Sequence, residues 1–347
     1  MKNFLYKTLL FLLPFIVLAA ITSSFFSLNQ GDLLRVGYLM KDNNYRTIFN
    51  NEYKLPIYYD SIYSLNTSKR SEYTFLTIGD SFAEQTNSGF KNYLAKFDNI
   101  NVLHINNLDC GKNPFQTIYG VINGDLLNKV KINCIILQSA QSLFVLRSQD
   151  IDKRNKLNIL DLNRLVEEFG NQKHKSNIFP PTQYLKFPLF SILYNINNHA
   201  FFSDVYKVKL KFNLFSGKKE NELLFPKDQL NLDNLTSDST SINKMNKELC
   251  DISSLLKKKG INLIVLPSPS KFDIYYNFIV EKDDFLKPNF FQIMKTLNKN
   301  YIYIDSYEIL TKHLPAKKDL YYFDDSHWSP WAAQILAKEI AASIDIH

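Results

Sequence analysis

Short apolar runs typical of β-strands recur along the chain, and the segments between them are long enough for helices. This rhythm constrains the fold more than any other feature. The runs stand at residues 73–78, 101–105, 132–137, 261–266 and 301–304. The first two crossovers, at roughly 82–97 and 114–130, have the length of helices. Strands that alternate with helices predict an α/β fold, in which a mostly parallel sheet lies between two helical layers.

Two later helices are marked by their ends. Apolar residues from Ile242 to Leu256 recur on one helical face, and Gly260 stands where a helix commonly ends. The last helix is predicted to begin at Ser329-Pro330, a typical N-cap and first-turn pair. Both helices belong to the second half of the α/β pattern.

The α/β rhythm is absent from two stretches. Residues 29–70 form a polar lead-in with little periodicity, and residues 145–240 are irregular and rich in Phe, Tyr, Asn and Lys. The aromatic content of 145–240 favours a partly helical insertion that packs against the main fold over a disordered segment. We therefore expect a membrane anchor or signal segment at 1–28, the lead-in, and one domain at 71–347 that carries the insertion.

The N-terminus predicts a membrane segment. Lys2 and Lys7 flank the start of an apolar stretch that spans residues 4–26, which is close to the roughly 20 residues that cross a bilayer. Basic residues ahead of such a stretch favour export of the chain that follows. We expect an uncleaved, single-pass anchor with the domain outside the cytoplasm. Small residues such as Ala19 and Ala20 leave a cleaved signal peptide as the alternative, which also exports the domain.

Composition argues against several functional classes. The net charge is +7, but Lys and Arg are scattered, and the densest run, at 257–259, ends a predicted helix. We therefore expect no nucleic-acid partner. The three cysteines lie far apart without a CxxC pair, so no thiolate metal site is predicted. No cofactor is expected either.

The first predicted strand leads into Gly79-Asp80-Ser81-Phe82. A serine at the carboxyl end of a parallel strand stands where open α/β sheets bind their ligands. A helix that begins directly after it would point backbone N–H groups at a developing oxyanion. Taken alone, the tetrapeptide is a weak signal and fits an ordinary strand-to-helix cap better than a nucleophile.

A second motif, Asp324-Asp325-Ser326-His327-Trp328, precedes the last helix. A serine nucleophile needs a base, and that base needs a carboxylate that fixes its tautomer. We predict that Ser81, His327 and either Asp325 or Asp324 converge, with the serine hydroxyl within about 3–4 Å of an imidazole nitrogen. The alternative is an exposed loop histidine without a catalytic role.

Together the two motifs resemble the SGNH (GDSL) hydrolase superfamily, whose first block is Gly-Asp-Ser and whose last block places an Asp shortly before a His. The branch most similar to this chain is that of the SGNH-like domains of alginate and other exopolysaccharide O-acetyltransferases, with the signature Asp-x-His-Trp. A Pro-rich turn with Lys271 and Tyr275 and the pair Tyr321-Tyr322 also resemble that branch. The order of serine before histidine is that of ordinary SGNH hydrolases. The resemblance implies a three-layer, flavodoxin-like fold.

The resemblance also implies roles for individual residues. Asp325 matches the Asp-x-His-Trp branch, whereas Asp324 matches the wider superfamily. The backbone N–H groups of Ser81 and Gly111 would hold the oxyanion, and Gln141 would replace the amide of the missing third-block asparagine. The supporting residues implied by the match are Asp80, Lys271, Tyr275 and Trp328.

The implied function is serine acyl transfer: O-acetylation of a cell-surface polysaccharide through an acyl-serine, alongside a membrane-bound O-acyltransferase that supplies the acyl group. Two alternatives remain open. The first is a carbohydrate esterase of SGNH type, and the second is a non-catalytic SGNH domain that binds polysaccharide or scaffolds an export complex. The aromatic insertion either lines an acceptor groove or packs onto the sheet.

Overall fold

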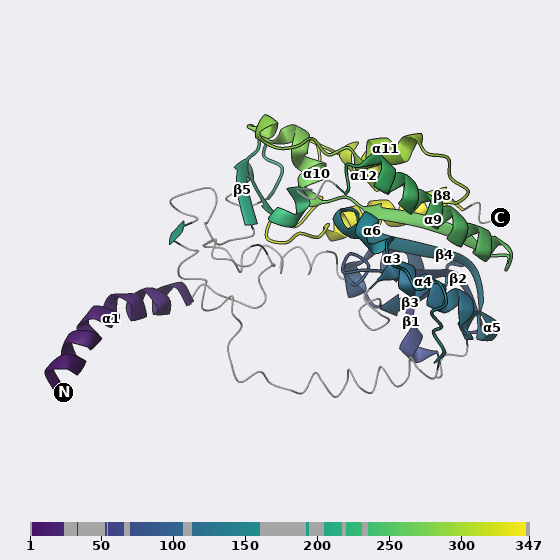
Figure 1. Ribbon diagram of the computed structural model, residues 1–347, viewed down its shortest axis with the longest axis horizontal. Helices are drawn as coiled ribbons and strands as arrows, with labels where there is room; N and C mark the ends of the chain where they lie inside the picture. The colour runs from purple at the N-terminus through teal and green to yellow at the C-terminus, as the bar shows by residue number, and fades with distance from the viewer. Residues whose placement is uncertain are drawn as a thin grey trace.

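The computed structural model places a six-stranded parallel sheet at the centre of the domain (Figure 1). The strands follow the order β1-β3-β2-β4-β7-β8. Their bounds are β1 Asp60–Ser61, β2 Glu72–Gly79, β3 Val102–Asn106, β4 Lys131–Ala140, β7 Asn262–Ser268 and β8 Ile302–Tyr303. The structure describes residues 2–23, 33, 53, 55–65, 70–106, 113–159, 192–193, 205–216, 220–230 and 235–344.

The five predicted strands are all present as β2, β3, β4, β7 and β8. Numbered among themselves, they take the order 2-1-3-4-5, which is the flavodoxin-like order. The predicted fold class is therefore confirmed. The strand order reverses between β2 and β4, which makes this the switch point of the sheet, and ligands are expected beyond the carboxyl ends of those two strands.

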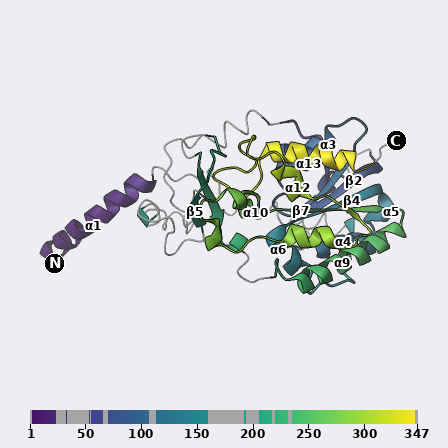
Figure 2. The same ribbon diagram turned by 90° about the horizontal axis from the view of Figure 1, so that it is seen from above.

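Alternation along the strands separates two apolar layers. Phe75 on β2 and Ile136 on β4 belong to one buried cluster, and their neighbours Leu76 and Ile135 belong to the other. The first cluster includes residues of α3, α10, α12 and α13, and the second includes residues of α4, α9 and α11. Figure 2 shows α3, α12 and α13 on one side of the sheet and α4 and α9 on the other. The helices on the first face are α3 Phe90–Ala95, α10 Lys271–Tyr275, α12 Ser306–Thr311 and α13 Pro330–Ala342. Those on the second face are α4 Pro114–Asn123, α9 Ser239–Lys257 and α11 Phe290–Thr296.

Both predicted helix ends are confirmed. Ser329 caps α13, since its side chain accepts from the backbone N–H of Trp331, and Pro330 occupies the first turn. Gly260 follows α9 with a φ of +75°, the left-handed conformation in which a side chain is disfavoured.

The crossovers of the first half differ from the prediction. The helix expected from about residue 82 begins only at Phe90, after a turn at 81–83 and the 3-10 helix η3 (Thr86–Ser88). The segment 114–130 holds two helices, α4 and α5 (Leu126–Lys129), because Gly124 leaves the helical conformation with a ψ of −168°. No α-helix begins directly after Ser81, so its backbone N–H lies on a tight turn and not at the helix N-terminus that the sequence predicted.

The predicted lead-in contributes the edge strand β1, which pairs in parallel with β3. Side chains anchor it, since Arg70 and the Tyr73 hydroxyl both donate to the carboxylate of Asp60. A strand of two residues is too short to produce a periodic pattern, which is why the sequence predicted no strand in this region.

The described part of the insertion packs onto the domain. α6 (Gln141–Arg147) leads into it, and it contains the antiparallel strands β5 (Val205–Lys209) and β6 (Glu222–Pro226) and the 3-10 helix η4 (Lys227–Leu230). Phe215 and Phe225 are buried, and their rings contact Tyr275 and Phe272 of α10. These aromatic side chains therefore pack the insertion onto the fold.

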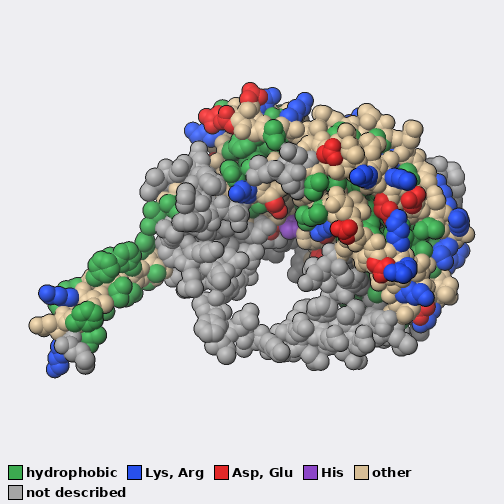
Figure 3. Space-filling view, viewed as in Figure 1, with side chains coloured by type: hydrophobic (Ala, Val, Ile, Leu, Met, Phe, Trp, Pro, Cys, Tyr) green, Lys and Arg blue, Asp and Glu red, His purple; other side chains and the backbone are tan. Residues whose placement is uncertain are grey.

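The predicted N-terminal helix is confirmed as α1 (Lys2–Ser23). Its stretch Lys2–Ile21 has a mean hydropathy of 2.2, and none of its residues is buried in the rest of the protein. Its apolar side chains stand exposed in Figure 3. Length and composition suit a membrane span, and a signal sequence would meet the same criteria.

Candidate active site

Ser81 lies on a tight turn at the carboxyl end of β2, which we call the Ser81 turn (residues 80–84). The carbonyl oxygen of Asp80 accepts from the backbone N–H groups of Ala83 at 2.8 Å and Glu84 at 3.2 Å. Gly79 is required before the turn, because a Cβ there would lie 2.4 Å from Oε1 of Gln138 and 2.6 Å from Cβ of Ala83. The turn leaves Ser81 exposed.

Residues 320–329 form a short hairpin, which we call the His327 loop. Tyr321 and Trp328 form an antiparallel bridge, and the backbone N–H of Tyr322 donates to the carbonyl oxygen of His327 at 3.2 Å. The N–H of Ser329 donates to the carbonyl oxygen of Leu320 at 2.9 Å. The loop thus delivers His327 from the start of α13 to the carboxyl end of β2.

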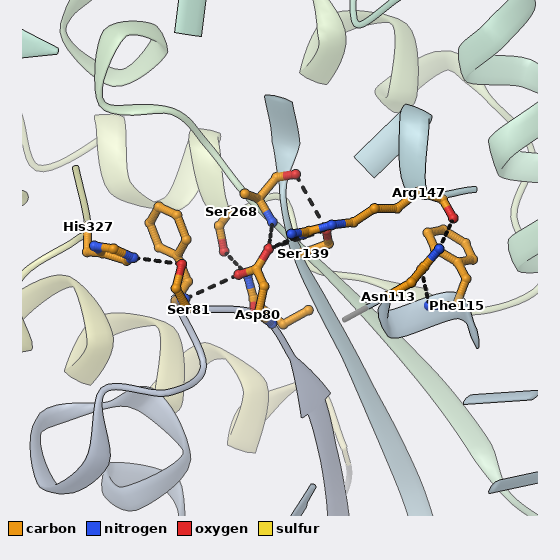
Figure 4. Close-up of polar contacts among 11 residues, drawn as sticks. Asp80, Ser81, Asn113, Phe115, Ser139, Arg147, Ser268 and His327 are labelled. Atoms are coloured by element: carbon orange, nitrogen blue, oxygen red, sulfur yellow. Dashed lines mark hydrogen bonds and ion pairs between the residues drawn. The ribbon is translucent and has the colours of Figure 1, made fainter. Parts of the chain in front are cut away.

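Ser81, His327 and Asp325 form one hydrogen-bonded chain. Nε2 of His327 lies 2.7 Å from Oγ of Ser81, within the predicted separation, as Figure 4 shows. Nδ1 of His327 lies 2.5 Å from Oδ1 of Asp325. A carboxylate only accepts hydrogen bonds, so Nδ1 of His327 carries the proton and donates to Asp325. Nε2 accepts a hydrogen bond from the hydroxyl of Ser81.

Asp325 is the carboxylate that contacts the imidazole. The same Oδ1 also accepts from the backbone N–H of His327 at 3.0 Å, which fixes the side chain under the ring. Asp324 is buried as well, and its carbonyl oxygen accepts from the N–H of Leu33 at 3.1 Å. Of the two candidates, the geometry favours Asp325 as the residue that orients His327.

Three predicted supporting residues hold the His327 loop. The fully buried ammonium of Lys271 donates to the carbonyl oxygens of Phe323 at 2.7 Å and Asp325 at 3.3 Å. The hydroxyl of Tyr275, whose pKa is raised by burial, accepts from the N–H of Tyr321. The carbonyl oxygen of Trp328 accepts from Nε2 of Gln85 at 2.8 Å. Their described contacts position the loop and do not touch Ser81.

Aromatic rings pack around the imidazole. The ring of Phe82 lies 4.7 Å from that of His327 and 4.9 Å from that of Trp328, measured between centroids. Trp328 is fully buried. This packing limits the rotamers of His327 and excludes water from one side of the ring.

The carboxylate of Asp80 is buried in a network that the sequence did not predict in full. Arg147 forms an ion pair with it, and Oδ2 also accepts from the N–H of Ala140 at 2.7 Å (Figure 4). Oδ1 accepts from Nε2 of Gln138 at 3.0 Å and from the N–H of Phe82 at 3.2 Å. Gln138 and Ala140 lie at the carboxyl end of β4, the strand beside β2, and this position could have identified them. Arg147 lies on α6, and nothing in the local sequence indicated that its side chain would contact Asp80.

The structure describes two of the three proposed oxyanion donors, Ser81 and Gln141. The backbone N–H of Ser81 has no acceptor among the residues the structure describes, so it is available to a ligand. Gly111 lies outside the described residues. Gln141 is buried at the start of α6, no described contact joins it to Ser81, and its amide has no partner in the described part of the chain. An oxyanion role for either stays a prediction.

The described ranges contain no group of three or more His, Cys, Asp or Glu side chains placed to hold a metal ion. Cys134 and Cys250 are both unpaired. Burial raises the pKa of the Cys134 thiol to about 12, so this side chain behaves as a small core residue.

A flavodoxin-like sheet with Ser81, His327 and Asp325 at its switch point defines an SGNH hydrolase-like architecture. Residues 220–347 match the family model of the SGNH hydrolase-like domain of acetyltransferase AlgX, which confirms the resemblance seen in the sequence. The matched range includes Asp325, His327 and Lys271 and begins after Ser81. Comparisons with curated proteins and with solved structures gave no match.

Proposed function

We propose that this chain is an extracytoplasmic serine acyl-transfer enzyme that O-acetylates a cell-surface polysaccharide through an acyl-serine intermediate. The observation that carries the proposal is the hydrogen-bonded chain Ser81–His327–Asp325, with separations of 2.7 and 2.5 Å. A serine, a base and an orienting carboxylate in this arrangement are the elements of nucleophilic acyl transfer. The match to an acetyltransferase domain supports acetyl as the transferred group.

In the first half-reaction, Oγ of Ser81 attacks the carbonyl carbon of an acetyl ester while its proton passes to Nε2 of His327. The carboxylate of Asp325 stabilises the imidazolium that forms. The backbone N–H of Ser81 is an oxyanion donor in this scheme. When the tetrahedral intermediate collapses, the ester C–O bond breaks, His327 returns its proton to the leaving alcohol, and acetyl-Ser81 remains.

In the second half-reaction, a polysaccharide hydroxyl attacks acetyl-Ser81 and gives its proton to His327. Collapse of this intermediate returns that proton to Ser81 and releases the O-acetylated polysaccharide. Water in place of the sugar would give an esterase. The two outcomes share every residue of the first half-reaction, so the acceptor alone separates them.

The location and partners are part of the same proposal. The exposed apolar helix α1 and the basic Lys2 and Lys7 support a single-pass membrane anchor with the domain outside the cytoplasm. A domain held at the outer surface of a membrane can receive acetyl groups from a membrane-bound O-acyltransferase. We therefore place the chain between such a donor and a polysaccharide acceptor.

The test uses the full-length chain in detergent with an activated acetyl ester and candidate polysaccharides, and follows ester loss and glycan ester gain separately. Wild type should form acetyl-Ser81, detectable by mass spectrometry, and acetylate a polysaccharide. Ser81→Ala should lose both activities, by roughly 10³-fold or more. The control Ser71→Ala changes an exposed serine at the other end of β2 and should behave as wild type.

Two results would contradict the proposal in different ways. Activity retained by Ser81→Ala would remove Ser81 as the nucleophile. Loss of ester without gain on any glycan, with Ser81 still required, would make the chain an esterase.

A further inference from the structure

A second group of buried polar side chains lies behind the Ser81 turn. His104 on β3 is its centre: Nε2 lies 2.9 Å from Oε1 of Glu84, and Nδ1 lies 2.8 Å from Oγ1 of Thr77 on β2. Lys91 on α3 completes the group, which we call the support cluster (Thr77, Glu84, Lys91 and His104). Three elements that are separate in sequence thus converge on the residues that follow Ser81.

Lys91 reaches the Ser81 turn directly. Its side chain is fully buried, and its ammonium donates to the carbonyl oxygen of Ala83. The ammonium also lies 4.8 Å from the centre of the Tyr59 ring. Burial lowers the pKa of Lys91 to about 8, and the charge of Glu84 opposes that shift. The amine therefore binds the turn despite a strong desolvation penalty.

The protonation of His104 follows from its partners. Burial, followed by the charge of Lys91, lowers its pKa, so the ring is neutral at pH 7. Because a carboxylate only accepts, Nε2 donates to Glu84, and Nδ1 accepts from the hydroxyl of Thr77. Glu84 therefore accepts a hydrogen bond from a buried imidazole whose other nitrogen is bound to Thr77.

The support cluster meets the Ser81 turn at two residues, Ala83 and Glu84. Glu84 contributes its carboxylate, Ala83 contributes its carbonyl oxygen, and the N–H of Glu84 donates to the carbonyl oxygen of Ser81 at 3.3 Å. Apolar side chains of similar volume would fill the same space without desolvating three ionisable groups. The cluster is therefore better explained by the geometry that it imposes on the turn than by its contribution to stability.

We propose that Glu84, His104 and Lys91 are positioning residues that hold Ser81 at His327. They restrain the turn from the side of β3 and α3, whereas Asp80 and Arg147 restrain it from the side of β4. The inference rests on the proposed function, since a positioning role has meaning only if Ser81 reacts. A displacement of about 1 Å at a reacting atom is enough to slow a reaction by about 10²-fold.

The test compares Glu84→Ala with Glu84→Gln in the full-length chain. Hydrolysis of a small activated acetyl ester gives kcat and KM, and the rate of Ser81 labelling by a fluorophosphonate reports the reactivity of the hydroxyl. Glu84→Ala should lower kcat and the labelling rate 10- to 100-fold, with KM unchanged. Glu84→Gln keeps an acceptor for Nε2 of His104 and should stay within about threefold of wild type.

Two further variants control for misfolding and for the loss of a glutamate as such. Thr77→Val preserves shape, removes the partner of Nδ1 of His104, and should lower kcat about 3- to 10-fold in a folded protein. Glu72→Ala removes an exposed glutamate from the start of β2 and should change neither rate. Thr77→Val decides the matter if Glu84→Ala fails to fold.

Wild-type kcat and labelling rates in folded Glu84→Ala or Thr77→Val would overturn the positioning role and leave the cluster structural. Failure of the proposed function gives different results: Ser81→Ala would keep its activity, or wild type would lose ester without gain on any glycan. The two hypotheses can therefore fail separately.

Discussion

The Ser81 turn and the His327 loop meet at one hydrogen bond, yet they are held by different kinds of force. Buried ionic and polar side chains restrain the Ser81 turn: the Asp80–Arg147 pair on one side and the support cluster on the other. The His327 loop is held by its own backbone bridge, by the packing of Trp328, and by Lys271 bound to carbonyl oxygens.

This difference has a physical reason. Ser81 itself is exposed, whereas Asp80 is buried and Glu84 is half-buried, so charged and polar side chains of neighbouring elements must pair with these two carboxylates and thereby fix the turn. The His327 loop instead leads into α13 and rests on the insertion, where Phe215 packs against Phe323. We therefore expect the Ser81 turn to respond to the loss of charges and the His327 loop to the loss of packing.

The largest expected effect concerns the hydrogen bond between Asp325 and His327. Asp325→Asn should lower kcat by roughly 10⁴-fold, because an amide in place of the carboxylate favours the wrong imidazole tautomer. Asp324→Asn is the matched control, and we expect a loss at least ten times smaller than that of Asp325→Asn. Ester hydrolysis by the two variants checks this, and equal losses would contradict the assignment of Asp325.

Removal of packing should destabilise the His327 loop most. Trp328 is fully buried against Phe82 and Phe90, so Trp328→Ala should lower the free energy of unfolding by about 3–5 kcal/mol. Trp331→Ala removes a half-buried ring three positions later and should have a smaller effect. Denaturant unfolding measures both, and a loss below about 1 kcal/mol for Trp328→Ala would break the comparison.

One ionisable group beneath the His327 loop should reduce stability. Both carboxyl oxygens of the buried Asp273 on α10 lack partners among the described residues, and burial raises its pKa from 3.8 to about 7. The folded state holds a proton that the unfolded state releases above pH 3.8. Stability is therefore lost as pH rises from about 4 to about 7, up to about 4 kcal/mol.

Asp273→Asn cannot titrate, so it should be more stable than wild type at pH 8, by up to about 4 kcal/mol. The two proteins should be similar near pH 4. Thermal unfolding between pH 4 and 8 measures the difference, and Asp283→Asn, which changes an exposed residue, serves as the control. A difference that does not grow with pH would show that Asp273 is paired or hydrated.

The smallest effect tests the contact between the Ser81 turn and β4. In Gly79→Ala the new methyl would overlap Oε1 of Gln138 and Cβ of Ala83, and we expect a loss of about 1–3 kcal/mol. Gly260→Ala meets no atom within 4 Å and should lose about 1 kcal/mol through its positive φ alone. Denaturant unfolding compares them, and a neutral Gly79→Ala would show that the turn can shift.

Local signals in the sequence were sufficient for most of the framework. Each predicted strand is an apolar run that ends near a turn residue, and the cap of α13 needs only Ser329 and Pro330. The motifs around Ser81 and His327 were visible because their residue types are chemically demanding and closely spaced. The α/β order of the elements then placed the carboxyl end of β2 at the switch point of the sheet.

Tertiary structure decided what spacing alone could not. Asp324 and Asp325 both precede His327, and only the fold of the hairpin puts the carboxylate of Asp325 at Nδ1. The partners of Asp80 and Glu84, Arg147 and His104, come from α6 and β3, and no local pattern records how far a long side chain reaches across a sheet. The sequence determines elements through contacts between near neighbours, whereas the restraint of Ser81 depends on contacts between strands and helices that only the folded chain brings together.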